Sequence, residues 1–132
     1  MLFRRLKKVH YCIIIGLIIL LVIIISLYNT KKGTILIIED SSGLGFSVQM
    51  SKYNSEKKYQ LYLSKSDMIQ VDVKHTEGIM ALTVNGESGS EPYTGNDLKT
   101  GVFTFRVSET DNYLFWFKGS SATGTVIIKN LK

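Results

Sequence analysis

The hydrophobic positions of the chain follow one pattern before residue 33 and another after it. From residue 11 to residue 28 the side chains form an uncharged apolar run, YCIIIGLIILLVIIISLY. From residue 34 onward, apolar and polar side chains alternate in short runs separated by turn-forming residues. A continuous apolar run predicts a membrane-spanning helix, whereas alternation predicts strands with one buried face.

The apolar run is long enough to cross a bilayer. At a rise of about 1.5 Å per residue it reaches about 27 Å, close to the thickness of the hydrocarbon core. Tyr11 and Tyr28 flank it, where amphipathic rings prefer the headgroup level. We therefore expect four parts: a basic tail (1–10), a transmembrane helix (11–28), a linker (29–33) and a separate domain (34–132).

The charges around the run predict its orientation. Four basic side chains precede it, namely Arg4, Arg5, Lys7 and Lys8. Because cytoplasmic flanks carry the excess of basic residues, we expect a cytoplasmic N-terminus and an extracytoplasmic domain at the cell membrane. A cleaved signal peptide would begin in the same way and is the alternative. We favour an uncleaved anchor, because Tyr28 occupies a position where cleavage requires a small side chain.

Charge is distributed unevenly along the chain. Residues 1–32 carry six basic and no acidic side chains, whereas residues 33–132 carry ten basic against eleven acidic ones, a net charge of −1. A nucleic-acid partner is therefore not expected for the domain. The single cysteine, Cys12, excludes an intrachain disulfide. It is either an acylated thiol or, as we favour, a small apolar residue of the helix.

The domain is predicted to consist of strands alone. Eight alternating runs are expected to be strands: 34–39, 46–51, 59–64, 68–75, 79–84, 102–107, 112–118 and 125–129. Short strands without crossover helices predict an all-β fold, an antiparallel, jelly-roll-like β-sandwich of about eight strands. The alternation also predicts a core that includes Tyr59, Leu61, Leu63, Ile69, Val71, Val73, Met80, Leu82, Val84, Phe103, Phe105 and Val107.

The segment 102–129, VFTFRVSETDNYLFWFKGSSATGTVIIK, combines an F-x-F-x-V strand, an E-T-x-x-Y turn and an aromatic strand. In these features it resembles the closing hairpins of GOLD-type jelly rolls and of bacterial pre-peptidase C-terminal domains. The resemblance implies an accessory or protein-interaction module. GOLD proteins carry their membrane helix after the domain and this chain carries it before, so cargo transport is not implied. The layout also resembles small membrane-anchored proteins of Gram-positive bacteria.

Few residues of the domain offer catalytic chemistry. His75 is its one histidine, either a general base or, as we favour, an exposed residue at the end of a strand. One histidine without cysteine argues against a zinc site. The segment Gly43-Leu44-Gly45 precedes a strand and opens no helix, which predicts a turn and not a phosphate loop. We expect no enzymatic activity and no cofactor.

One candidate binding site is the long interruption at residues 85–101. Loops of this length inside compact domains are often functional. Its candidate residues are Glu87, Glu91, Tyr93, Asn96 and Asp97. Their oxygen atoms could bind calcium, but their spacing is not that of a regular calcium loop, so we favour a solvated crossover between two sheets.

The second candidate site is the aromatic run at residues 113–117. Alternation cannot bury all five side chains on one face, so Leu114 and Trp116 are either covered or, with Tyr62, form an apolar patch. We expect a protein-interaction or accessory module whose partner is another membrane or envelope protein. The alternative is a sandwich that binds carbohydrate or calcium, and a hydrolase using His75 is a third hypothesis.

Overall fold

The structure is a computed structural model that describes residues 2–30 and 32–132. Met1, in the predicted tail, and Lys31, in the predicted linker, lie outside the described residues. The chain divides into two compact units, Met1–Lys31 and Lys32–Lys132.

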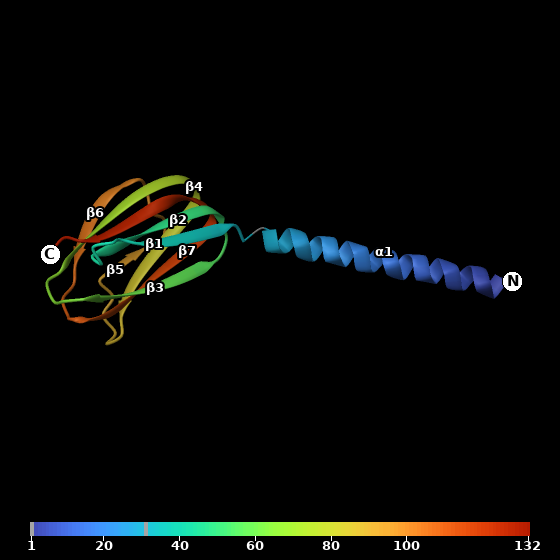
Figure 1. Cartoon of the computed structure of the whole chain (residues 1–132), viewed down its shortest axis with the longest axis horizontal. Helices are drawn as coiled ribbons and strands as arrows, with labels where there is room; N and C mark the ends of the chain where they lie inside the picture. The colour runs from blue at the N-terminus through green and yellow to red at the C-terminus, as the bar shows by residue number, and fades with distance from the viewer. Residues whose placement is uncertain (1, 31) are drawn as a thin grey trace. The chain divides into compact units, whose positions relative to one another are not determined.

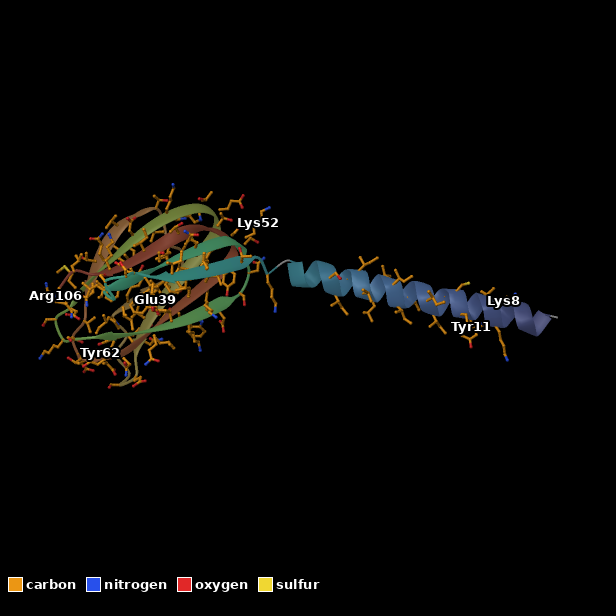
Figure 2. The ribbon with its side chains drawn as sticks, in the orientation of Figure 1. Lys8, Tyr11, Glu39, Lys52, Tyr62 and Arg106 are labelled. Carbon is orange, nitrogen blue, oxygen red and sulfur yellow. The ribbon has the colours of Figure 1, made fainter. Side chains whose placement is uncertain are left out.

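The first unit is a single helix, α1 (Leu2–Thr30) (Figure 1). Its segment Lys7–Ser26 is long and apolar enough to cross a membrane, a test that an N-terminal signal sequence also passes. The helix begins before the apolar run, because the leucine, arginine and lysine residues of the basic tail favour helix. Lys8 and Tyr11 are labelled on it in Figure 2, whereas the side chains of Arg4 and Arg5 lie outside the described ones.

The second unit contains seven strands in the described residues. They are β1 (Thr34–Glu39), β2 (Gly45–Tyr53), β3 (Glu56–Leu63), β4 (Met68–Gly86), β5 (Tyr93–Gly95), β6 (Gly101–Arg106) and β7 (Asp111–Asn130). Every pairing between them is antiparallel. The predicted class, an all-β antiparallel domain preceded by an apolar helix, is confirmed.

Two of the predicted chain reversals are bends inside long strands. The predicted strands 68–75 and 79–84 are two halves of β4, and 112–118 and 125–129 are two halves of β7. The two long strands pair along their length, with register shifts on both sides of Glu77. Gly78 and Ser121, both at positive φ, lie at this bend. Turn-forming residues here mark a bulge, which bends a strand without reversing it.

The bend converts one hydrogen-bonded sheet into two layers. The first sheet has the order β1-β2-β7-β4-β6 and the second has the order β3-β7-β4-β5, so β4 and β7 belong to both (Figure 1). Phe46 of β2 lies over Tyr59 of β3, with ring centroids 4.1 Å apart. At the opposite edges, Tyr93 of β5 lies over Phe103 of β6 at 4.8 Å. These ring contacts join the inner faces of a β-sandwich.

The core lies between the two layers. Its buried hydrophobic residues all come from residues 46–128. The predicted core is confirmed: eight of the twelve predicted residues are buried, and Tyr59, Leu61, Phe103 and Phe105 are partly buried against them. The unit Lys32–Lys132 therefore contains a complete hydrophobic core of its own, which is the condition for folding without the helix.

Candidate functional site

The outer side of the second sheet brings together the three residues of the predicted patch. Tyr113, Phe115 and Phe117 are buried, so the alternate residues of β7, Leu114 and Trp116, lie on the outer side. Neighbouring strands add polar side chains in register. Gln60 of β3 and Asn85 of β4 both lie opposite Leu114. Tyr62 lies opposite Asn112, and Lys58 lies opposite Trp116. We call this surface the Tyr62 face and define it by Lys58, Gln60, Tyr62, Asn85, Glu87, Asn112, Leu114, Trp116 and Lys118.

Tyr62 is the exposed aromatic residue of this face. Its relative exposure is 62%, and Figure 2 labels it on the domain. Asn112, its partner in the register of β3 with β7, lines a hollow of about 190 Å³. The other residues of that lining are Gln60, Asn85, Gly86, Glu87 and Leu114. The hollow therefore combines one apolar side chain with three amides and one carboxylate. Amide side chains both donate and accept hydrogen bonds.

Trp116 is partly covered by lysine side chains. The Nζ atom of Lys118 lies 4.1 Å from the centroid of the indole ring, and that of Lys58 lies 4.6 Å from it. Such contacts are worth roughly 0.5–1 kcal/mol each at exposed positions. Sequence reasoning missed both lysines as residues of this site, although the alternation already places Lys118 on the same side of its strand as Trp116.

The turn beside the hollow is held by Asp111. Its carboxylate accepts the Ser88 N–H at 2.8 Å and the Asn112 N–H at 2.8 Å. The Ser88 N–H, more than any other contact, holds the pKa of the Asp111 carboxyl below its ordinary value. In addition, the Glu87 N–H donates to the Asn112 carbonyl oxygen at 3.1 Å. These bonds fix the backbone that carries Glu87 and Asn112 at the rim of the hollow.

The 85–101 segment, expected to be one long interruption, contains the end of β4, the strand β5 and the first residue of β6. It crosses between the sheets and is pinned to the core. Tyr93 stacks on Phe105 with ring centroids 5.7 Å apart, and burial raises the pKa of its hydroxyl. Leu98 is buried, and its N–H donates to the Met80 carbonyl oxygen at 2.8 Å. The ring contact of Tyr93 and the burial and hydrogen bond of Leu98 hold this crossover against the core.

The predicted oxygen ligands of this segment are engaged separately. Glu91 accepts the Thr94 hydroxyl, Asp97 pairs with Lys99 at 3.1 Å, Asn96 is exposed, and Glu87 lies at the hollow. Across residues 2–30 and 32–132, no group of three or more His, Cys, Asp or Glu side chains could hold a metal ion. Only Glu87 of this set contributes to the Tyr62 face.

His75 lies inside β4 at the bend, so the expectation that it ends a strand is wrong. Its ring atom Nε2 donates to the Gly78 carbonyl oxygen at 2.5 Å, and its backbone N–H donates to Thr100 Oγ1 at 2.9 Å. The imidazole thus bridges the register shift of β4. The strand was expected to end here because Glu77-Gly78 suggests a turn, but Gly78 lies at a bulge inside β4.

A larger hollow, of about 430 Å³, lies on the outer side of the first sheet. Its lining is hydroxyl-rich, with Thr34, Leu36, Gln49, Met50, Ser51, Lys74, Thr76, Thr123, Gly124 and Thr125. This set contains no aromatic ring. The Tyr62 face differs from this hollow in joining aromatic rings to amide groups.

No protein-family model and no curated protein matches the chain. Among solved structures, a carbohydrate-binding module from Cellvibrio mixtus lichenase 5A, in complex with cellotriose, is 17% identical with a TM-score of 0.42, covering 76% of this chain and 88% of that chain. A low-affinity xylan-binding module from Roseburia intestinalis is 14% identical with a TM-score of 0.41, covering 73% and 81%. PliG of Aeromonas hydrophila, a periplasmic inhibitor of g-type lysozyme, is 13% identical with a TM-score of 0.45, covering 70% and 91%. At such identities and scores these likenesses carry no inference about a ligand, and the resemblance to GOLD-type domains stays a prediction.

Proposed function

We propose that this chain is a membrane-anchored glycan-binding module whose ligand lies on the Tyr62 face. The observation that carries the proposal is an exposed tyrosine whose register partner, Asn112, lines a hollow together with the amides of Gln60 and Asn85. The proposal assigns binding and not catalysis to the domain. A carbohydrate ligand is the alternative that the sequence predicts, and the proposal assigns this ligand to one surface of the domain.

The chemistry of the Tyr62 face suits a sugar ring. A pyranose presents C–H groups on its faces and hydroxyl groups around its edge, so it needs an apolar platform with donors and acceptors beside it. The tyrosine ring is such a platform, and the amides supply both donors and acceptors. A hollow of about 190 Å³ is smaller than the 300 Å³ or more of typical small-molecule pockets. It therefore fits one sugar unit of a longer chain that continues over the open surface.

Tyr62, and not Trp116, is the stacking residue in this proposal. The lysine ammonium groups already lie over the indole ring, and a sugar would have to displace them. The Tyr62 ring is open to solvent. Lys58 and Lys118 instead place positive charge beside the ligand, which favours glycans that carry carboxylate or phosphate groups.

The helix α1 is the anchor in this proposal. Its apolar length supports a membrane span, and the basic residues before the span support a cytoplasmic N-terminus. The domain then lies outside the cell membrane, where envelope glycans occur. External protease should digest the domain in intact cells. Protection until the membrane is permeabilised would overturn this orientation.

Calorimetric titration of residues 32–132 with envelope oligosaccharides tests the binding proposal. We expect Tyr62→Ala to weaken binding about five-fold, because stacking on an aromatic ring is worth roughly 1 kcal/mol. Tyr62→Phe retains the ring and should retain most of the affinity. Val102→Ala, at an exposed position of the first sheet, is the matched control. Equal affinities of the Tyr62→Ala and control variants would contradict the proposal.

A further inference from the structure

The strand β1 is a sheet edge without the usual protection against pairing. Edge strands are normally protected by charged side chains, by proline or by short length. Two edges of this domain follow that rule, because β3 begins Glu56-Lys57-Lys58 and β5 has three residues. The edges β1 (TILIIE) and β6 (GVFTFR) each carry one charge, at the last residue. Of these two, β1 is the edge that exposes two large apolar side chains, Leu36 and Ile38. This edge is the one whose composition favours the addition of another strand.

The backbone of β1 has groups available for a new strand. β1 pairs with β2 on one side and ends the strand order of the first sheet. The Asp40 N–H donates to the Gly45 carbonyl oxygen, which defines a hydrogen-bonded pair in the register of β1 with β2. Because such pairs alternate along an antiparallel ladder, the N–H and C=O groups of Ile35, Ile37 and Glu39 point away from β2. Three residues thus offer a ladder of donors and acceptors.

The side chains of β1 add apolar surface beside that ladder. Leu36 and Ile38 lie on the outer side of the first sheet and are 53% and 47% exposed. Ile35 and Ile37 pack against the core. A strand added at this edge would therefore bury apolar side chains together with the free backbone groups.

We propose that β1 pairs with β1 of a second copy of this chain, antiparallel and centred on Ile37. In this register the outward-pointing groups of Ile37 meet those of Ile37 in the second copy. Leu36 then lies opposite Ile38 of the second copy, and Ile38 opposite Leu36. The two first sheets become one continuous sheet across a twofold axis.

The charges at the ends of β1 support a second copy in the antiparallel direction. Exposed Lys32 precedes the strand, and its carbonyl oxygen is held by the Asn54 N–H at 2.8 Å. Glu39 and Asp40 end the strand. Antiparallel pairing places the basic start of one copy near the acidic end of the other, whereas parallel pairing would place like charges together. The charges at the ends of β1 are therefore complementary to those of a second β1 that runs in the opposite direction.

The same geometry limits the assembly to two copies. Twofold pairing is isologous and consumes the β1 edge of both chains. The far edge of the continuous sheet is then β6, which ends in Arg106 in each copy. The contact is independent of the Tyr62 face, which lies on the second sheet.

Disulfide trapping of residues 32–132 tests the register. This unit contains no cysteine, so each variant carries a single thiol. Leu36 and its opposite Ile38 would form a non-hydrogen-bonded pair, with Cα atoms about 4.5 Å apart, within the range for a disulfide. Under mild oxidation, an equal mixture of Leu36→Cys and Ile38→Cys should form the mixed dimer at least ten-fold faster than Val102→Cys forms its own dimer. Val102 is the matched control, because it is 61% exposed on the outer side of β6.

Sedimentation measurements on the unmodified unit supply the second readout. The unit should dimerise as its concentration rises, Leu36→Lys should abolish the dimer, and Val102→Lys should leave it intact. Thermal melts of each variant establish that it is folded. Equal trapping rates for the mixture and for Val102→Cys, or a monomer at all concentrations up to about 1 mM, would overturn the proposal and leave a strand from another protein as the occupant. Tyr62→Ala should bind glycan weakly and still dimerise, so the two proposals fail separately.

Discussion

Replacing Phe46 by alanine measures how firmly the two layers of the sandwich are packed together. Phe46 lies on β2 of the first sheet and is 2% exposed. Its ring contacts Tyr59 of β3 and Phe115 and Phe117 of β7, with centroids 4.1, 5.4 and 6.0 Å away. All three neighbours belong to the second sheet. The truncation therefore removes contacts made across the core.

The expected loss of stability follows from burial and from these ring contacts. Truncating a buried phenylalanine costs about 3–5 kcal/mol, including the cavity that is left. Three aromatic neighbours argue for the upper part of this range, because each such pair adds roughly 0.5–1.5 kcal/mol beyond burial. For a domain of about a hundred residues, 1 kcal/mol lowers Tm by about 4–8 °C. A loss near 4 kcal/mol therefore predicts a decrease of about 16–32 °C.

Urea denaturation of residues 32–132, followed by circular dichroism, provides the assay. Val102→Ala, on the exposed side of β6, should change the free energy of unfolding by less than about 0.5 kcal/mol. A loss below about 1 kcal/mol for Phe46→Ala, at an unchanged m-value, would refute the packing of β2 over β3 and β7. The bend of β4 and β7 would then need another explanation.

Three further predictions concern the bend and two titrating groups. Gly78→Ala should destabilise the domain by about 1–3 kcal/mol more than Gly43→Ala in urea denaturation, because both glycines have φ near 70° but only at Gly78 would a Cβ meet a backbone oxygen, that of Ser121, at 2.2 Å. The pKa of Asp111 is lower in the folded domain than in the unfolded chain, where it is about 4. The ionised carboxylate therefore stabilises the fold above about pH 4, and this contribution is lost as the pH falls through the pKa of the folded state. Asp111→Asn should therefore lose less stability than the parent between about pH 5 and pH 2, and equal losses in acid denaturation would contradict this. Burial and the hydrogen bond that its hydroxyl donates to the Glu39 carboxylate raise the pKa of Tyr59 to about 12. The neutral Tyr59 hydroxyl therefore stabilises the fold fully below about pH 10, and this contribution disappears as the pH rises through about 12. Tyr59→Phe should show a weaker alkaline loss, and ultraviolet titration of the phenolate that gave an ordinary pKa for Tyr59 would refute the assignment.

The fold was largely predictable because alternation is a local property. Strand residues such as Val71 and Leu82 point inward wherever their strand is placed, so the sequence pattern identified the core. The bends at Gly78 and Ser121 were not predictable, because the same residue types form hairpin turns and bulges. Only pairing with the partner strand decides between the two, and that pairing is a long-range property.

The candidate site was predictable only in part for the same reason. Alternation places Leu114 and Trp116 on one side of their strand, and the structure places Tyr62, the third predicted residue of the patch, on the neighbouring strand β3. The amides of the hollow come from three strands, and no spacing in the sequence brings them together. The position of Lys58 over Trp116 likewise depends on the register of β3 against β7, which local patterns do not specify.

Mapping a ligand on the domain by NMR decides whether the Tyr62 face binds a glycan. Residues 32–132, labelled with ¹⁵N, would be titrated with neutral and acidic envelope oligosaccharides, including peptidoglycan fragments. If the Tyr62 face binds the glycan, the backbone signals of Tyr62, Asn85 and Asn112 should shift together and saturate, whereas those of Val102 on the first sheet should remain in place. Saturable shifts confined to the first sheet, or no shifts with any oligosaccharide at about 10 mM, would contradict binding at the Tyr62 face.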